Sequence, residues 1–313
     1  MIISASYKTD IPTFYGEWFM NRLRAGYCKM VNPYGRQVYT IDLTPEDVDG
    51  FVFWTKNIGP FLKHLSEVCK MGYPFIVQHT ITGYPRELEF RVINYTHTIE
   101  FMKALAGRYG PHVAVWRYDP IVISSLTSTD WHRRNFAKLA KSLEGTTDEV
   151  VVSFAQIYKK TRRNLDWAAS EFAFRWSEHE AMTTGDVRSL ISELAQISRS
   201  HRMRLKICSQ KGFLSLGITE EARCVDAERL EKVSGRQIVD RVERKGNRKE
   251  CGCFASKDIG EYDTCPHGCV YCYAVQNREL ALSRYKEHDP TSEFLFPPKD
   301  RIPQAYDDKE GIY

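Results

Sequence analysis

The sequence predicts an α/β protein built on a parallel sheet of about six strands, arranged either as a βα barrel or as a doubly wound sheet. Short apolar runs alternate with helix-like segments along residues 1–217, which is the pattern of repeated β–α units. The runs are nearly continuous in Val, Ile and Phe, as is typical of parallel strands that are buried on both faces. The composition changes after about residue 217, where charged residues and then cysteines become frequent.

The expected strands are separated by segments with clear helix signals. Pro12 suits the first turn of a helix, Leu23 lies on its apolar face, and Gly26 ends it. Residues 129–145 begin with a Thr-Asp cap and end at a glycine, and residues 165–202 predict two amphipathic helices. The six expected strands are residues 2–6, 50–55, 74–80, 112–118, 149–155 and 204–209.

The composition is that of a globular protein with a sizeable core. The chain has 313 residues, of which 42% are hydrophobic and 27% charged, and its formal net charge is +4. No run approaches the ~20 apolar residues of a membrane span, and the start lacks the layout of a signal peptide. We therefore expect a cytoplasmic protein with no membrane partner, whose nine cysteines are thiols or metal ligands rather than disulfides.

The stretch "TCPHGCVYCYA" places Cys265, Cys269 and Cys272 within eight residues. Structural zinc usually takes two pairs of ligands from separated knuckles. Three closely spaced thiolates instead suit a cuboidal iron–sulfur cluster, because one wrapped loop can reach three iron corners. With only three protein ligands, the fourth iron stays open to a small molecule. The alternative is a zinc or purely structural site.

The spacing C-x3-C-x2-C, with Tyr271 before the third cysteine, resembles the signature of radical S-adenosylmethionine (SAM) enzymes. The resemblance implies a full or partial, TIM-like βα barrel of about six strands and a 4Fe–4S cluster on Cys265, Cys269 and Cys272. It also implies that SAM chelates the open iron and is cleaved reductively to a 5′-deoxyadenosyl radical, with Tyr271 against the adenine. The electron would come from a donor such as a flavodoxin or ferredoxin. The substrate is not implied.

Nearly the whole chain also resembles an uncharacterised prokaryotic family that has only a domain-of-unknown-function label. The segments that carry this resemblance are "ISASYKTDIPTFYGEWFMNRL", "FVFWTKN", "VWRYDPI", "YKKTRRNL" and "CGCFASKDIGEYDTCPHGCVYCYA". In most radical SAM enzymes the cysteine loop follows the first strand, whereas here it follows all six. We therefore expect a permuted arrangement, with a barrel in residues 1–217, a cysteine-rich cluster-binding appendage in residues 218–290 that folds over the barrel mouth, and a C-terminal strap in residues 291–313.

Four further cysteines form a possible second set. Cys208 ends the sixth expected strand, Cys224 begins the appendage, and Cys251 and Cys253 form a "CGC" pair. Four thiolates are the right number for a closed site, either a second 4Fe–4S cluster, which we favour, or a structural zinc. The alternative is that "CGC" is only a tight turn beside the first cluster.

Polar groups follow the expected strands where a barrel enzyme needs them. Thr55, Lys56 and Asn57 lie at the end of the second strand, and Arg117 and Asp119 lie at the end of the fourth. SAM has a carboxylate, a ribose diol and a cationic sulfur, so these five residues are candidates for binding it. The alternative for Arg117 and Asp119 is a buried ion pair that ties two layers of the barrel together.

Basic residues gather after the fifth expected strand, in "YKKTRRN". Lys159, Lys160, Arg162 and Arg163 could contact phosphates beside stacking aromatics, which makes a nucleic acid a candidate partner or substrate for repair or modification. The default interpretation is a solvated charged face. The alternative function for the whole chain is a non-catalytic iron–sulfur or zinc protein that binds nucleic acid or a protein partner.

Two single residues carry weaker expectations. His79, near the end of the third expected strand, is interpreted as a structural histidine with satisfied hydrogen bonds. Gly260, in "SKDIGEY" before the cysteine loop, is expected to need a special backbone angle.

Overall fold

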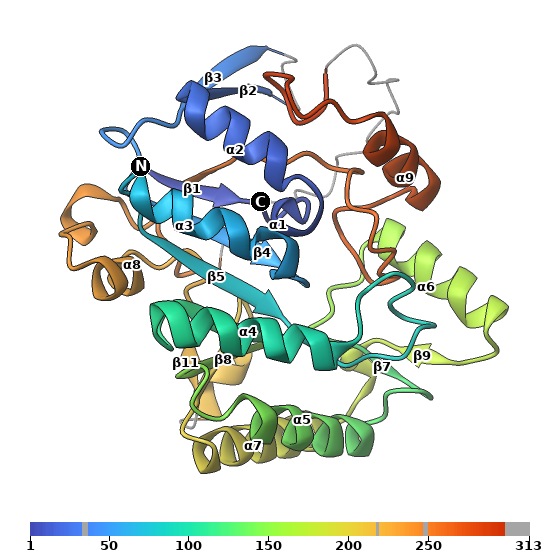
Figure 1. Cartoon of the computed structure of the whole chain (residues 1–313). Coiled ribbons are helices and arrows are strands. Elements are labelled where there is room, and N and C mark those ends of the chain that lie inside the picture. The colour runs from blue at the N-terminus through green and yellow to red at the C-terminus, as the bar shows by residue number, and fades with distance from the viewer. Residues whose placement is uncertain (33–36, 217–218, 247–249, 298–313) are drawn as a thin grey trace.

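The protein is described by a computed structural model that covers residues 1–32, 37–216, 219–246 and 250–297 (Figure 1). Its main sheet has eight parallel strands in the order β11-β10-β8-β6-β5-β4-β1-β12. These strands are β1 (Ile2–Ala5), β4 (Gly50–Thr55), β5 (Phe75–Thr80), β6 (Ala114–Ile121), β8 (Glu149–Phe154), β10 (Arg204–Ile207), β11 (Glu220–Glu221) and β12 (Ser256–Asp258).

The α/β class and all six expected strands are confirmed, as β1, β4, β5, β6, β8 and β10. From β1 to β11, each strand of the sheet pairs with the sheet strand that follows it in the chain. The order reverses once, after β11, because β12 lies on the other side of β1. Among the described residues no ladder joins β11 to β12, and the sheet is therefore not a closed barrel.

The two edge strands were not expected, and both come from residues 218–290. β11 consists of Glu220 and Glu221, and β12 of Ser256, Lys257 and Asp258, so neither has the apolar run that marks the other strands. They pair with β10 and β1 respectively. Residues 218–290, which were expected to form the appendage, therefore supply both edges of the main sheet.

One face of the sheet is covered by a row of amphipathic helices (Figure 1). Phe19 packs against Phe51 with ring centroids 5.1 Å apart, and Phe136 stacks on Trp116 at 4.8 Å. The α-helices of the described residues, on this face or elsewhere, are α1 (Ile11–Phe14), α2 (Gly16–Ala25), α3 (Leu62–Lys70), α4 (Tyr95–Tyr109), α5 (Thr129–Leu143), α6 (Lys159–Glu171), α7 (Thr184–Ser200), α8 (Ala227–Ser234) and α9 (Arg278–Glu287). The two helices expected within residues 165–202 are α6 and α7, although α6 begins earlier, at Lys159.

The other face has a smaller core, in which Ile2, Val52 and Ile76 pack against Leu230 of α8 and Phe254. The chain between β10 and β12 therefore fills the inner side of the sheet. The described residues also form short 3-10 helices, η1 (Gly59–Phe61), η2 (His179–Ala181), η3 (Lys211–Leu216) and η4 (Val239–Arg241). Two small antiparallel pairs lie outside the main sheet, β2 (Tyr27–Val31) with β3 (Val38–Asp42) and β7 (Ile123–Ser124) with β9 (Trp176–Ser177).

The first part of the expected C-terminal strap packs on the outside of α2. The Trp18 indole donates a hydrogen bond to the Ser292 carbonyl at 3.0 Å, and the Arg22 guanidinium donates to the Thr291 carbonyl at 3.1 Å. The rest of the strap, residues 298–313, lies outside the described residues. No helix in the described part of the chain is long and apolar enough to cross a membrane.

Candidate functional site

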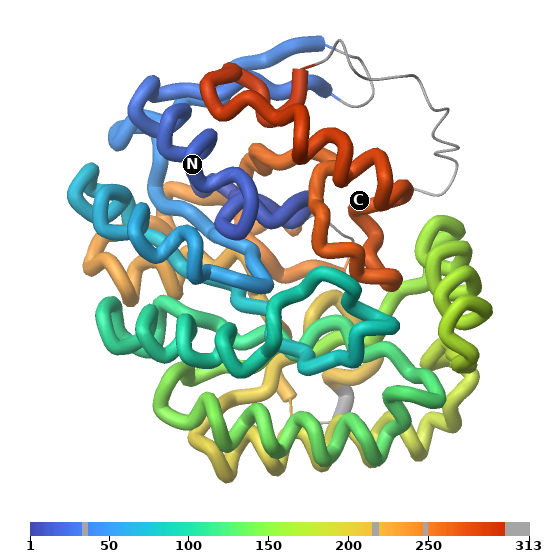
Figure 2. The backbone as a smooth tube through the Cα atoms, turned by 45° about the vertical axis from the view of Figure 1, so that its right-hand side comes forward, coloured from blue at the N-terminus to red at the C-terminus, as the bar shows by residue number. Residues whose placement is uncertain are grey.

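The three-cysteine loop lies at the carboxyl ends of neighbouring strands. It comes shortly after β12, and Figure 2 shows this C-terminal segment against the N-terminal part of the chain. The Val270 amide donates to the Leu88 carbonyl at 3.1 Å, which joins the cysteine loop to the loop after β5. The Tyr15 hydroxyl donates to the Thr264 carbonyl at 2.5 Å, which joins it to the corner between α1 and α2.

The three thiols are close enough for their charges to interact. Burial raises the pKa of Cys265, Cys269 and Cys272, and neighbouring thiols raise those of Cys265 and Cys269 further. Three thiolates this close together are therefore unfavourable without a positive partner, and a cluster iron would supply that charge. The donor set fits an iron–sulfur cluster in number and chemistry. As the described residues are arranged, however, no group of three His, Cys, Asp or Glu side chains could hold a metal ion without adjustment.

A buried ion pair holds the cysteine loop to the sheet. The Lys56 ammonium lies 2.8 Å from the Glu89 carboxylate, to which Thr82 donates at 2.7 Å and the Tyr271 hydroxyl also donates. Burial raises the pKa of Glu89, but the Lys56 charge and these hydrogen bonds outweigh it and hold the pKa below its ordinary value. The Lys56 charge also favours the thiolate of Cys269. Glu89 therefore links the end of β4 to the cysteine loop.

A second polar link runs through Asp10 and His267. The Asp10 carboxylate lies 2.8 Å from His267 Nε2 and accepts hydrogen bonds from the amides of Lys56 at 2.8 Å and Thr13 at 2.9 Å. Asp10 thus caps α1 and holds the residue between the first two cysteines of the loop at the same time. Both oxygens of this buried side chain are used to set the position of the loop.

Among the three candidates at the end of β4, only Lys56 reaches the cysteine loop. The Thr55 hydroxyl lies 3.1 Å from that of Thr13, and the Asn57 side chain accepts from the Gly59 amide at 3.1 Å. These two side chains shape the turn in which they lie.

Tyr271 is also engaged with protein groups. Its ring packs edge-to-face on Tyr84, with centroids 5.7 Å apart, and the Lys56 ammonium lies 5.7 Å from its centroid. With its hydroxyl on Glu89, Tyr271 joins the cysteine loop to the segment that follows β5.

Arg117 and Asp119 form an ion pair, as the alternative interpretation of them states. The Ser153 hydroxyl donates to Asp119, and Arg117 donates to Gln78 Oε1 at 3.2 Å and to Cys224 Sγ at 2.8 Å. The pair therefore contacts the second set of cysteines and not the three-cysteine loop.

The second set of cysteines is drawn together from three separate segments. Cys208 Sγ lies 3.5 Å from Cys224 Sγ, and the Cys224 amide donates to Cys253 Sγ at 3.1 Å. Cys251 follows at the end of the row, where its interaction with the Cys253 thiol lowers its pKa to about 7. The four thiols, which were expected to hold one closed metal site, form a row in the structure.

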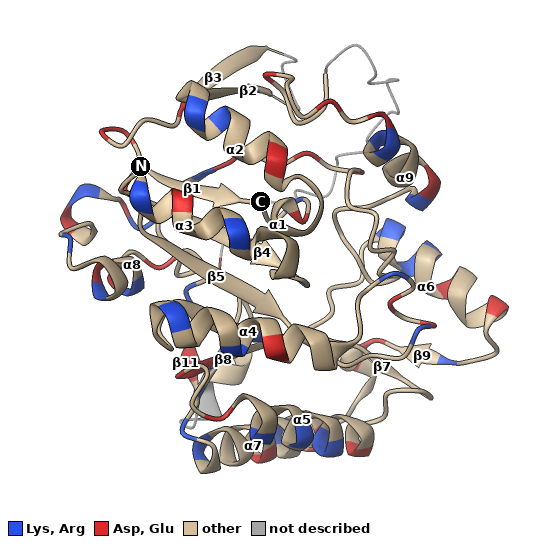
Figure 3. Ribbon diagram, viewed as in Figure 1, with Lys and Arg blue, Asp and Glu red and all other residues tan. Residues whose placement is uncertain are grey.

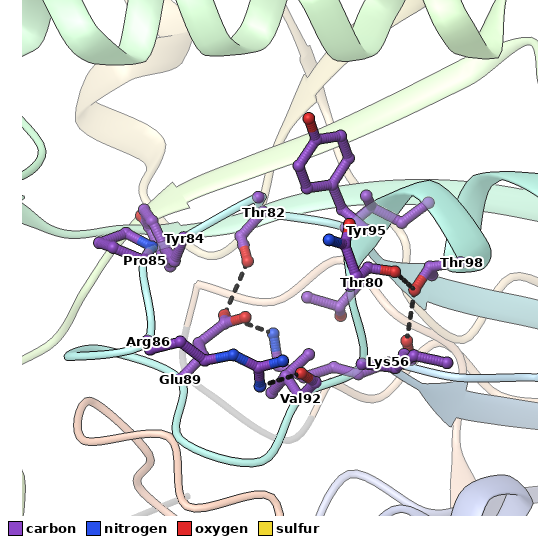
Figure 4. Close-up of a pocket in the computed structure, with 14 residues that line it drawn as sticks. Lys56, Thr80, Thr82, Tyr84, Pro85, Arg86, Glu89, Val92, Tyr95 and Thr98 are labelled. Carbon is purple, nitrogen blue, oxygen red and sulfur yellow. Dashed lines mark hydrogen bonds and ion pairs between the residues drawn. The ribbon is translucent and has the colours of Figure 1, made fainter.

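A pocket of about 220 Å³ lies beside the Lys56–Glu89 pair, which holds the cysteine loop (Figure 4). It lies over the segment between β5 and α4, and the Lys56–Glu89 pair forms part of its lining. The Arg86 guanidinium donates to the Val92 carbonyl at 2.6 Å and so braces the outer wall. Sequence patterns did not identify Glu89 or this pocket, because residues 81–94 have no regular periodicity. The only feature of the sequence that points to them is that they follow an expected strand.

The basic residues of "YKKTRRN" lie at the start of α6 (Figure 3). Arg162 pairs with Glu178, and the Arg163 guanidinium donates to the Gln276 carbonyl at 2.6 Å. The Lys160 ammonium lies 5.4 Å from the ring centroid of Tyr262. Part of this basic cluster therefore holds the chain on either side of the cysteine loop.

The structure overturns both weaker expectations. His79 is fully buried, and neither of its ring nitrogens has a hydrogen-bond partner among the described residues. Burial lowers its pKa to about 3. Gly260 does not adopt a positive φ, but a Cβ at this position would lie 1.9 Å from Ser6 Oγ. Glycine is needed there because the backbone passes close to β1.

Comparison with known proteins gives one family. The family model described as Domain of unknown function (DUF1848) matches residues 2–274, which include the six expected strands, the second set of cysteines and the three-cysteine loop. No curated protein and no solved structure matches the chain.

Proposed function

This chain belongs to the DUF1848 family, a domain of unknown function, and we propose that it is a radical SAM enzyme with a cluster on Cys265, Cys269 and Cys272. In the enzymes that its cysteine spacing resembles, the cysteine loop follows the first strand of a full or partial βα barrel. Here the loop follows β12, which is last of the strands in the chain but lies at the edge of the sheet beside β1. The strand that precedes the cysteine loop therefore has the same place in the sheet as in the radical SAM enzymes that the spacing resembles, although it comes at the end of the sequence and not at its start.

This position of β12 is the observation that carries the proposal. The sheet between β12 and β11 is interpreted as a partial barrel whose strands follow one another in order. Its catalytic end is the one where the strands finish, and the cysteine loop lies there beside the residues that follow β1, β4 and β5. A cluster-binding loop attached to any other edge or end of the sheet would not reproduce this arrangement.

The chain's own residues hold the loop and shape its surroundings. Asp10 and Glu89 fix the loop through His267 and Tyr271, and Lys56 places a positive charge beside Cys269. When bound, the 4Fe–4S cluster with SAM would supply one-electron cleavage of the SAM sulfonium and a radical that abstracts hydrogen from a substrate. Thr55, Asn57, Arg117 and Asp119 remain candidates for contacting SAM, although each already has a protein partner.

The test is SAM cleavage by protein that is purified and reconstituted without oxygen. Reduced parent protein should convert SAM to 5′-deoxyadenosine and methionine, measured by mass spectrometry. It should also show a cluster electron paramagnetic resonance signal that changes when SAM is added. Cys269→Ala should lose both, because it removes one of three protein ligands, whereas Cys69→Ala, at an exposed thiol in α3, should retain them.

A cluster that forms on the parent protein but neither binds nor cleaves SAM would refute the proposal. That result would favour the other class of function, a non-catalytic iron–sulfur protein that binds nucleic acid or a protein partner. The electron donor is expected to be a flavodoxin or ferredoxin, and replacing the chemical reductant with each of these tests that point separately.

A further inference from the structure

The second set of cysteines lies where the chain after β11 contacts the segment that leads into β12. Cys208 directly follows β10, and Cys224 follows β11. Cys251 and Cys253 belong to the segment that leads into β12 at the opposite edge. This segment runs beside the chain after β11, because the Phe254 amide donates to the Val225 carbonyl at 3.0 Å. The cysteines therefore stand at the crossing from one edge of the sheet to the other.

The separation of the sulfur atoms distinguishes the two kinds of closed site. Four thiolates around one tetrahedral ion, each about 2.3 Å from the metal, lie about 3.8 Å from one another. Thiolates on different corners of a 4Fe–4S cube lie farther apart, about 6 Å, because each extends outward from its own iron. Cys208 Sγ and Cys224 Sγ are 3.5 Å apart, which matches the single ion. A direct disulfide would need about 2.05 Å.

Hydrogen-bond donors point at two of the four sulfurs, and they oppose the neighbouring thiols and the burial that raise the pKa of Cys224 and Cys253 to about 12. Cys253 Sγ accepts hydrogen bonds from the amides of Cys224 at 3.1 Å and Val225 at 3.4 Å. Cys224 Sγ accepts one from the Arg117 guanidinium at 2.8 Å. Donors aimed at sulfur stabilise the negative thiolate far more than the neutral thiol, which is only a weak acceptor. Cys224 and Cys253 are each 4% exposed, so without an ion these charges would be buried next to one another.

We infer that Cys208, Cys224, Cys251 and Cys253 bind one tetrahedral Zn²⁺ ion, rather than the second iron–sulfur cluster that their number alone favoured. The thiols now form a row in the order Cys208, Cys224, Cys253 and Cys251, and the ion draws the two ends of the row around one centre. Bound zinc then joins the β10–β11 edge to the segment entering β12, where no backbone ladder in the described residues does so. This inference stands independently of SAM chemistry.

The experiment is metal analysis of the full chain by mass spectrometry after purification in zinc-supplied medium, on four proteins. The parent should contain one zinc per chain. The triple variant with Cys265, Cys269 and Cys272 all changed to Ala should lose its iron and keep the zinc. The double variant Cys251→Ser with Cys253→Ser should lose at least tenfold in zinc and melt at a lower temperature, but keep the iron. Cys69→Ser, at an exposed thiol, should match the parent.

A second measurement keeps the inference testable if the double variant folds poorly. Co²⁺ added to zinc-free protein should give the intense charge-transfer and visible bands of a tetrahedral tetrathiolate site, and one equivalent of Zn²⁺ should abolish them. Eight iron atoms per chain and no zinc would overturn the single ion in favour of a second cluster. Four iron atoms, no zinc and no cobalt bands would overturn the site altogether. A parent protein that contains the zinc but does not cleave SAM would count against the proposed function only.

Discussion

The buried Lys56–Glu89 pair offers a sharp test of how the cysteine loop is held. The Glu89 side chain is 5% exposed and the Lys56 side chain 13%, so the pair is largely shielded from water. Removing one partner of a buried pair leaves an uncompensated charge and typically costs about 3–5 kcal/mol. In Glu89→Ala the hydroxyls of Thr82 and Tyr271 also lose their acceptor, at about 1 kcal/mol each. We therefore expect Glu89→Ala to lower the free energy of unfolding by an amount at the upper end of this range, about 5 kcal/mol.

The double variant separates the charge effect from packing. Replacing both members of a buried pair by apolar groups of similar volume is often nearly neutral. Lys56→Met with Glu89→Leu should therefore be more stable than Glu89→Ala, by about 2–4 kcal/mol. The exposed pair of Arg24 and Glu67, whose side chains are 49% and 41% exposed, provides the matched control. Glu67→Ala should change stability by less than about 1 kcal/mol.

The assay is differential scanning calorimetry under nitrogen on protein with the same metal content. At roughly 2 °C per kcal/mol for a chain of this size, Glu89→Ala should melt about 10 °C below the parent, and Glu67→Ala within about 2 °C of it. The reasoning fails if the two single variants melt at the same temperature. It also fails if the double variant is less stable than Glu89→Ala, because the ion pair would then contribute net stability that apolar groups cannot replace.

Two further predictions concern other regions. His132 is buried, its Nε2 donates to the Val122 carbonyl at 3.0 Å and its Nδ1 accepts from the Tyr118 hydroxyl at 2.8 Å. Burial lowers its pKa to about 4. In the unfolded chain this histidine binds a proton near pH 6.5. The free energy of unfolding should therefore fall as the pH drops from about 6.5 to 4, by up to about 1.4 kcal/mol per pH unit. His132→Gln should make the melting temperature less dependent on pH over this window, and an unchanged slope would contradict the lowered pKa of His132. For the basic start of α6, Lys159→Ala with Lys160→Ala should weaken binding of single-stranded RNA or DNA and make the log–log salt slope shallower by about one to two units. Lys138→Ala with Lys141→Ala on α5 is the control, and equal slopes for the two double variants would leave the α6 residues as ordinary surface charge.

The strands that sequence patterns predicted are those whose cores are apolar. β4 and β8, with "GFVFWT" and "EVVVSF", bury almost every side chain, so their composition alone identifies them. β11 and β12 contain only charged and polar residues and form because the neighbouring edges of the sheet accept them. That dependence on tertiary pairing leaves no periodic signal in the sequence.

The candidate site also has features that the sequence alone predicts and features that depend on contacts between distant parts of the chain. The spacing of Cys265, Cys269 and Cys272 is local and can be identified without a structure. The role of Glu89 depends on contacts with Lys56 and Tyr271, which come from distant parts of the chain. Arg117 was expected to serve SAM from its position after a strand, but only the structure places it against Cys224. Strand-end position predicts that a side chain is near the site, not which partner it meets.

The location of β12 has a consequence for how the protein is made. A ribosome releases β1 first, and its pairing with β4 becomes possible once residue 55 has emerged. The other edge of β1 must wait for Ser256–Asp258, some two hundred residues later. Until then the nascent chain presents an open strand edge with the apolar sequence "IISA", which is a template for pairing with other chains. Synthesis of the cysteine loop thus coincides with closure of that edge, so a chain interrupted before residue 256 both lacks the loop and remains prone to aggregate.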